Sequence, residues 1–155
     1  MKLKLAAVTL GVGLPAIALS QIIWPNPPGI ELPPQPLFGL YIALSVVEGL
    51  LFGLGVAFLA FGLPLVRRAR ISPRLTWATY LSIAWLLVNW WPHDNFHRAN
   101  GYDIAGLIRI EYGFHATLYL AGMVTAWYFI TVLRGDGSAV ARAALERPAA
   151  ARNSI

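Results

Sequence analysis

The sequence predicts an all-α membrane protein, folded as a bundle of four transmembrane helices. Hydrophobic residues make up 57% of the chain and charged residues only 12%, whereas about a quarter of a typical soluble domain is charged. Long apolar runs alternate with short polar segments that carry most of the basic residues. At 155 residues the chain makes one domain, which we divide into a transmembrane part, residues 1–135, and a cytoplasmic tail, residues 136–155.

Four apolar runs are each near or above the length that spans a bilayer. They are Leu5–Trp24, Leu37–Val66, Leu75–Trp91 and Ile104–Leu133. A helix needs about 20 apolar residues to cross the hydrocarbon core, and lipid offers no partner for unpaired backbone groups. We therefore expect each run to form a transmembrane helix.

The first run has an alternative interpretation as a secretory signal peptide. A basic start, an apolar stretch and the small residues around Ala18 and Ser20 resemble a signal with its cleavage site. However, the apolar run continues through Ile22 and Ile23, which makes it longer than a usual signal core. We interpret it as a retained helix.

The basic residues predict that both termini face the cytoplasm. Lysine and arginine favour the cytoplasmic ends of membrane helices, and here they flank the N-terminus, the turn between the second and third runs, and the start of the tail (Lys2, Lys4, Arg67, Arg68, Arg70, Arg74 and Arg134). The loops Pro25–Pro36 and Pro92–Asp103 then face outward. We expect an integral multi-pass protein, in the cytoplasmic membrane if the source is bacterial.

Composition also limits the partners and cofactors. The formal charge of +5 comes largely from basic residues at the ends of the apolar runs, where they set membrane orientation. We therefore expect the lipid bilayer as a partner and no nucleic acid. The chain has no cysteine, which excludes disulfides, thiolate metal sites, iron–sulfur clusters and covalent haem attachment.

Within the second run, Gly49 and Gly53 have the spacing that lets membrane helices approach closely, and we expect them to pack inside the bundle.

The segment Asn89–Tyr119 holds all three histidines. Pro92 suits the start of a helix and Gly101 the position after its end, so a short interfacial helix, His93–Asn100, is expected in the second outer loop. Alternatively, the third transmembrane helix continues through a kink at Pro92. In either arrangement His93 and His97 are four residues apart and share a helix face.

The fourth run supplies a second pair of the same kind. Asp103 is a suitable N-cap, and Glu111 and His115 share a face of the helix that follows. Glu48 is an ionisable residue inside an apolar run, which is costly and usually marks function. Glu48, His93 and His115 each lie 19 residues from the arginine at the cytoplasmic end of their run, about 28 Å along a helix. They are therefore expected at a similar depth, near the outer membrane face.

These residues together predict a metal site. The expected ligands are imidazoles and carboxylates (Glu48, His93, His97, Glu111 and His115), with Asn89 and Asp94 supporting them from outside the ligand set. Such ligands suit a divalent transition metal, zinc or iron above all, and the lack of sulfur argues against copper(I). Haem held by His115 with His93 or His97 is also considered, but conventional four-helix cytochromes place that pair deeper, so haem ranks lower.

Three functions fit this pattern. The first is a small membrane metalloprotein whose outward-facing site does redox or hydrolytic chemistry on a lipid-soluble substrate. The alternative is a non-catalytic subunit or assembly factor of a larger membrane complex, in which the polar cluster locks the bundle together. A proton or ion pathway is weakest, because the sequence between Glu48 and Arg67 carries no ionisable residue. Whether the protein is an enzyme is left open.

Overall fold

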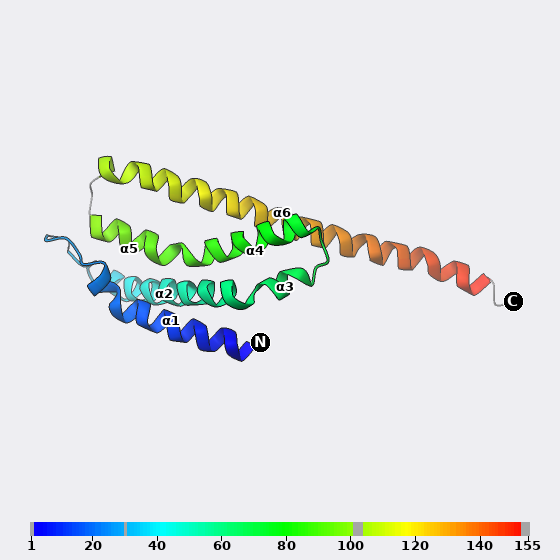
Figure 1. The fold of residues 1–155 in the computed structure, drawn as a ribbon, viewed down its shortest axis with the longest axis horizontal. Coiled ribbons are helices and arrows are strands. Elements are labelled where there is room, and N and C mark those ends of the chain that lie inside the picture. The colour runs from blue at the N-terminus through cyan, green and yellow to red at the C-terminus, as the bar shows by residue number, and fades with distance from the viewer. Residues whose placement is uncertain (1, 30, 101–103, 153–155) are drawn as a thin grey trace.

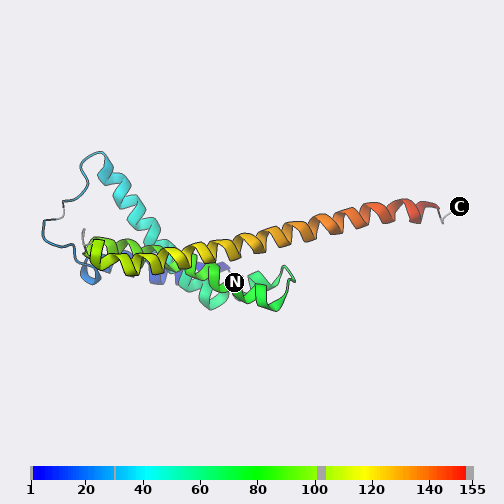
Figure 2. The ribbon, with the colours of Figure 1, turned by 90° about the horizontal axis from the view of Figure 1, so that it is seen from above.

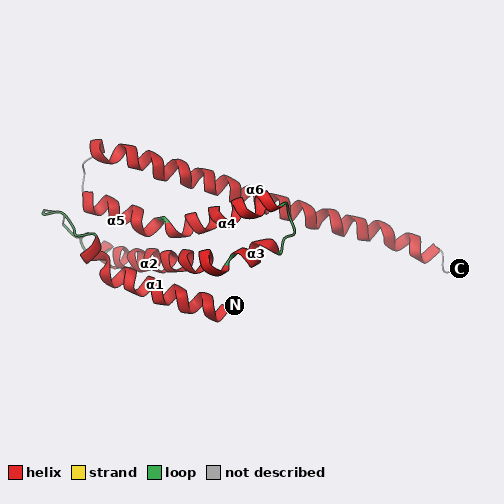
Figure 3. Cartoon of the chain, in the orientation of Figure 1, coloured by secondary structure: helices red, strands yellow, loops and turns green. Residues whose placement is uncertain are grey.

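In the computed structural model, all regular secondary structure of the described residues is helical (Figures 1 and 3). The described residues are 2–29, 31–100 and 104–152, with side chains given up to residue 135 except 104, 106 and 109. The helices are α1 Lys2–Ile23, α2 Leu37–Phe61, α3 Leu63–Arg67, α4 Pro73–Val88, α5 Trp90–Asn100 and α6 Ile104–Arg152.

Three helical segments are long and apolar enough to cross a membrane: α1, α2 and the part of α6 from Ile110 to Gly135. The predicted all-helical fold with multiple possible membrane spans is therefore confirmed. The third predicted run forms α4, which at 16 residues is shorter than a bilayer span. It continues into α5, so the fourth span and the orientation of the bundle stay predictions.

The junction of α4 and α5 lies at Asn89. Backbone hydrogen bonds cross it, from Asn89 N to Trp85 O at 3.0 Å and from His93 N to Asn89 O at 3.1 Å, so the two helices run end to end (Figure 1). The short helix expected to start at His93 starts at Trp90, with Pro92 inside its first turn. Proline is tolerated in the first turn of a helix, although it cannot donate to the carbonyl four residues earlier, at the end of α4. Gly101 and Asp103, expected to flank the α5–α6 connection, lie outside the described residues.

α1 and α2 pack backbone against backbone through glycines. A Cβ on Gly53 would lie 2.7 Å from Gly13 N, and one on Gly13 would lie 2.9 Å from Gly49 O, closer than side chains normally approach. Gly55 sits as tightly on α4, since its Cβ would lie 2.8 Å from Val88 N. The prediction that the α2 glycines pack inside the bundle is confirmed.

The two ends of the bundle carry different segments of the chain. The N-terminus of α1 and the α3–α4 turn lie at one end, and the loop after α1 lies at the other, near α5 (Figure 1). Figure 2 shows α6 extending well beyond the other helices on the side of the N-terminus, and the first turns of α2 leaning away from α6. α6 continues without a break past the expected tail boundary at residue 136, to Arg152.

Candidate metal centre

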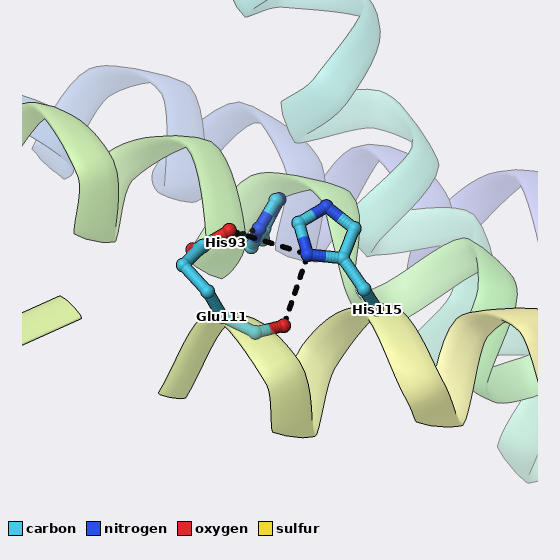
Figure 4. Close-up of side chains that lie close together, drawn as sticks. All are labelled: His93, Glu111 and His115. Atoms are coloured by element: carbon cyan, nitrogen blue, oxygen red, sulfur yellow. Dashed lines mark hydrogen bonds and ion pairs between the residues drawn. The ribbon is translucent and has the colours of Figure 1, made fainter. Parts of the chain in front are cut away.

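α5 and α6 bring the three histidines onto one carboxylate. His93 and His97 share a face of α5, and Glu111 and His115 share a face of α6. From Glu111 Oε1, the Nε2 atoms of His97 and His93 lie 2.6 and 3.3 Å away, and His115 Nδ1 lies 3.2 Å from Oε2. Figure 4 shows Glu111 and His115 rising from adjacent turns of α6 toward His93. The predicted contact between the His93/His97 pair of α5 and the Glu111/His115 pair of α6 is therefore present.

The spacing of these atoms suits a single metal ion. Ligand atoms of His93, Glu111 and His115 all lie within 4.8 Å of one another. Nitrogen and oxygen ligands bind zinc at about 2.0–2.2 Å, so two ligands of a tetrahedral site are about 3.3 Å apart. His93 Nε2 lies 3.3 Å from Oε1 of Glu111 and His115 Nδ1 lies 3.2 Å from Oε2, so each imidazole is at about that separation from one carboxylate oxygen. These three residues could hold a metal ion without large movement.

The central carboxylate is surrounded by imidazole nitrogens. Glu111 Oε1 is shielded from solvent, and its contacts are the Nε2 atoms of His97 and His93, without a well-aligned hydrogen bond. A buried polar atom without a hydrogen bond is costly, and a cation between the carboxylate and the imidazoles would remove that cost. His115 Nδ1 also lies 2.9 Å from the Glu111 backbone O. For Nδ1 to bind a metal, the ring must be in the tautomer with its proton on Nε2, because only an unprotonated ring nitrogen offers a lone pair.

The environment of His93 favours the neutral ring that a metal requires. Burial lowers the pKa of His93 below its ordinary value, and the neighbouring imidazoles of His97 and His115 lower it further, while the charge of Glu111 opposes them. His97 and His115 are more open, with side chains 41% and 48% exposed. The side of the group formed by His93 is therefore shielded from solvent, and the side formed by His97 and His115 is accessible.

A second polar cluster lies on a neighbouring face of α5, and we call it the Arg98 cluster. Arg98 donates to Tyr41 Oη and to Asn95 Oδ1, both at 2.6 Å, and its Nε lies 3.2 Å from Asp94 Oδ2. The Glu48 carboxyl interacts with Asp94 and Arg98. Ser20 in α1 donates to Asn95 Oδ1 at 2.6 Å. The cluster thus ties α1 and α2 to α5.

The structure separates the predicted site residues into two groups. His93, His97, Glu111 and His115 come together, whereas Glu48 and Asp94 belong to the Arg98 cluster, and all three histidines pair with Glu111. Asn89 precedes His93 by one helical turn, and its backbone carbonyl accepts the ordinary helical hydrogen bond from His93 N. The Asn89 side chain is 1% exposed, and neither of its polar atoms has a hydrogen-bond partner.

Sequence reasoning missed Arg98, Asn95 and Tyr41 as parts of a buried network. A signal was present, because Asp94 and Arg98 are four residues apart and share a face. An intramembrane carboxylate such as Glu48 is expected to seek a partner. Arg98 is a cation near the same expected depth.

Fold and site together define an all-helical protein with helices that could span a membrane and a His–Glu group that could hold a metal ion. Comparison with family models, with curated proteins and with solved structures gives no match. The function is therefore argued from the site alone.

Proposed function

We propose that the protein is a small multi-pass membrane metalloprotein whose His–Glu site lies at the outer membrane face. His93, Glu111 and His115 are the ligands in this proposal. The observation that carries it is the convergence of imidazoles from two helices on the shielded Glu111 carboxylate. Two imidazoles and one carboxylate form a ligand set used by catalytic zinc and by non-haem iron(II).

The orientation is N-in and C-in, with α4 and the start of α5 as the fourth span. The arrangement in Figure 1 supports this, because the N-terminus and the arginine-rich α3–α4 turn lie at the same end of the bundle. Positive charges there favour the cytoplasm. The histidine group lies toward the other end, so it faces the outer compartment, and the rest of α5 lies at the interface.

His97 has a supporting role in this site. Its Nε2 contacts Glu111 Oε1 at 2.6 Å, which orients the carboxylate and holds α5 against α6. With three ligands from the protein, a fourth position stays open for water or a substrate atom, as in catalytic zinc sites. The metal would polarise that bound group, and the exposed sides of His97 and His115 give access to it. Hydrolytic chemistry with zinc and redox chemistry with iron both fit this ligand set.

Haem fits this geometry poorly. The His93 and His115 rings lie 5.2 Å apart, nearly perpendicular, and both contact Glu111. The carboxylate therefore occupies the space that a macrocycle held between these two rings would need. Glu48 is left out of the ligand set because its carboxyl interacts with Asp94 and Arg98 instead.

Metal binding by the purified full-length protein tests the proposal. Elemental analysis after loading with zinc or iron(II) should give one equivalent per chain. Glu111→Gln should lower the affinity by at least about tenfold, the smallest loss typical even for residues that only support a ligand. Glu48→Gln is the matched control and should bind as the wild type does. Equal affinity of the wild type and Glu111→Gln would refute the site and favour the alternative, a non-catalytic subunit of a larger membrane complex.

A further inference from the structure

An apolar groove runs between α4 and α6 beside the candidate metal centre. Its volume is about 340 Å³, and its lining consists of Trp85, Ile110, Gly113, Phe114 and Thr117. That volume lies within the range of small-molecule sites, about 300–1,000 Å³. The groove opens toward the outside of the bundle, which in a membrane is the lipid.

The polar atoms of the lining side chains are paired with one another. Trp85 Nε1 donates to Thr117 Oγ1 at 3.1 Å. The Thr117 hydroxyl in turn lies 2.8 Å from Gly113 O and 2.9 Å from Phe114 O. An occupant therefore meets apolar surface and side-chain polar groups that already have partners. Because a polar ligand would lose its hydrogen bonds to water without replacement, this lining selects an apolar one.

The groove reaches the metal centre through Phe114. The Phe114 ring stacks parallel to Trp85, with centroids 6.5 Å apart, and its centroid lies 5.0 Å from that of His93. In the sequence, Gly113 and Phe114 lie between Glu111 and His115. A molecule lying in the groove would contact Phe114, whose ring packs against the candidate ligand His93.

We propose that this groove binds the apolar part of a lipid-soluble substrate and places its polar group at the metal. This inference rests on the proposed function and names the substrate class, a membrane-dissolved amphiphile with a hydrocarbon chain or ring. Gly113 keeps the groove open, because a Cβ at this position would have no atom within 4 Å. The substrate enters sideways from the bilayer, since the open side of the groove faces lipid.

Photolabelling of the metal-free, full-length protein in lipid nanodiscs tests the groove independently of the metal. The probe is a long-chain fatty alcohol with a diazirine on its chain. Labelling of the segment 110–117 should saturate and should be competed by unlabelled fatty alcohol. Gly113→Leu fills the groove and should abolish the saturable labelling. Gly122→Leu is the matched control on the same helix, also with open space around the Cβ, and should label as the wild type does.

A second apolar groove provides an internal reference. It lies between α2 and α4, has a volume of about 410 Å³ and is lined in part by Leu59 and Leu81. It shares Trp85 with the first groove but lacks Phe114, the residue that contacts His93. Labelling of Leu59 and Leu81 should therefore rise linearly with probe concentration, as expected for bulk lipid. Thermal unfolding should show that Gly113→Leu is folded, because leucine favours a helix more than glycine does.

The outcomes separate the two proposals. Saturable labelling that Gly113→Leu removes supports the groove, even if elemental analysis finds no metal, in which case only the metal function fails. Labelling at 110–117 that never saturates, or that folded Gly113→Leu leaves unchanged, overturns the groove whatever the metal content.

Discussion

His97 Nε2 in α5 lies 2.6 Å from Glu111 Oε1 in α6. This contact fixes which face of α5 turns toward α6. The neighbouring face, about 100° round the helix, carries Asp94 and Arg98. It turns toward α2, where these residues interact with Glu48 and Tyr41. The short helix α5 therefore separates two polar clusters, one with the composition of a metal site and one that joins helices.

The orientation of the bundle can be tested with reporter fusions. Fusions after Pro28 and after Asn100 should report the outer compartment, because the basic turns lie at the other end of the helices. A fusion at Arg70, in the arginine-rich turn, is the control and should report the cytoplasm. A cytoplasmic signal from either outer fusion would reverse the proposed placement of the histidine group.

Gly53→Leu should destabilise the contact between α1 and α2. A side chain there would run into the α1 backbone at Gly13, and overpacking of this kind costs about 1–3 kcal/mol. Thermal unfolding in detergent should show a lower midpoint. The matched control, Gly39→Leu on the same helix, meets open space and should unfold like the wild type. Equal midpoints for both variants would show that α1 does not pack on α2 as described.

Arg98→Met should destabilise the protein without removing its metal. The substitution leaves the carboxyls of Glu48 and Asp94 without their cation and removes two hydrogen bonds, a loss of about 1–3 kcal/mol for each buried group left unpaired. Adding Glu48→Gln should recover part of the loss, because the two residues interact. Arg68→Met, an exposed position in the α3–α4 turn, controls for loss of charge. Additive effects of Arg98→Met and Glu48→Gln would argue against the described cluster.

Hydrophobic runs and residue spacing predicted much of this structure. The apolar runs gave the long helices, and the four-residue spacings predicted that His93 and His97, and Glu111 and His115, share faces. Glycine spacing predicted the close packing of α2. These features depend on local periodicity, which the sequence displays directly.

The placement of Glu48 could not be predicted in the same way. Counting residues from the cytoplasmic arginines gives the depth of a side chain, and it does not give the direction in which the side chain points around its helix. The sequence predicted that Glu48 points toward the histidines, and in the structure its carboxyl interacts with Asp94 and Arg98. Which residues it meets depends on how α2 packs against its neighbours, and this tertiary packing is not visible in local periodicity.

The local environment of a bound metal tests the central proposal most directly. Zinc-loaded, full-length protein should give an X-ray absorption spectrum with nitrogen and oxygen ligands at about 2.0–2.2 Å. It should also show the outer-shell scattering of two imidazole rings, from His93 and His115. A spectrum with oxygen neighbours alone and no imidazole scattering, or a protein that retains no stoichiometric metal, would contradict the metal site.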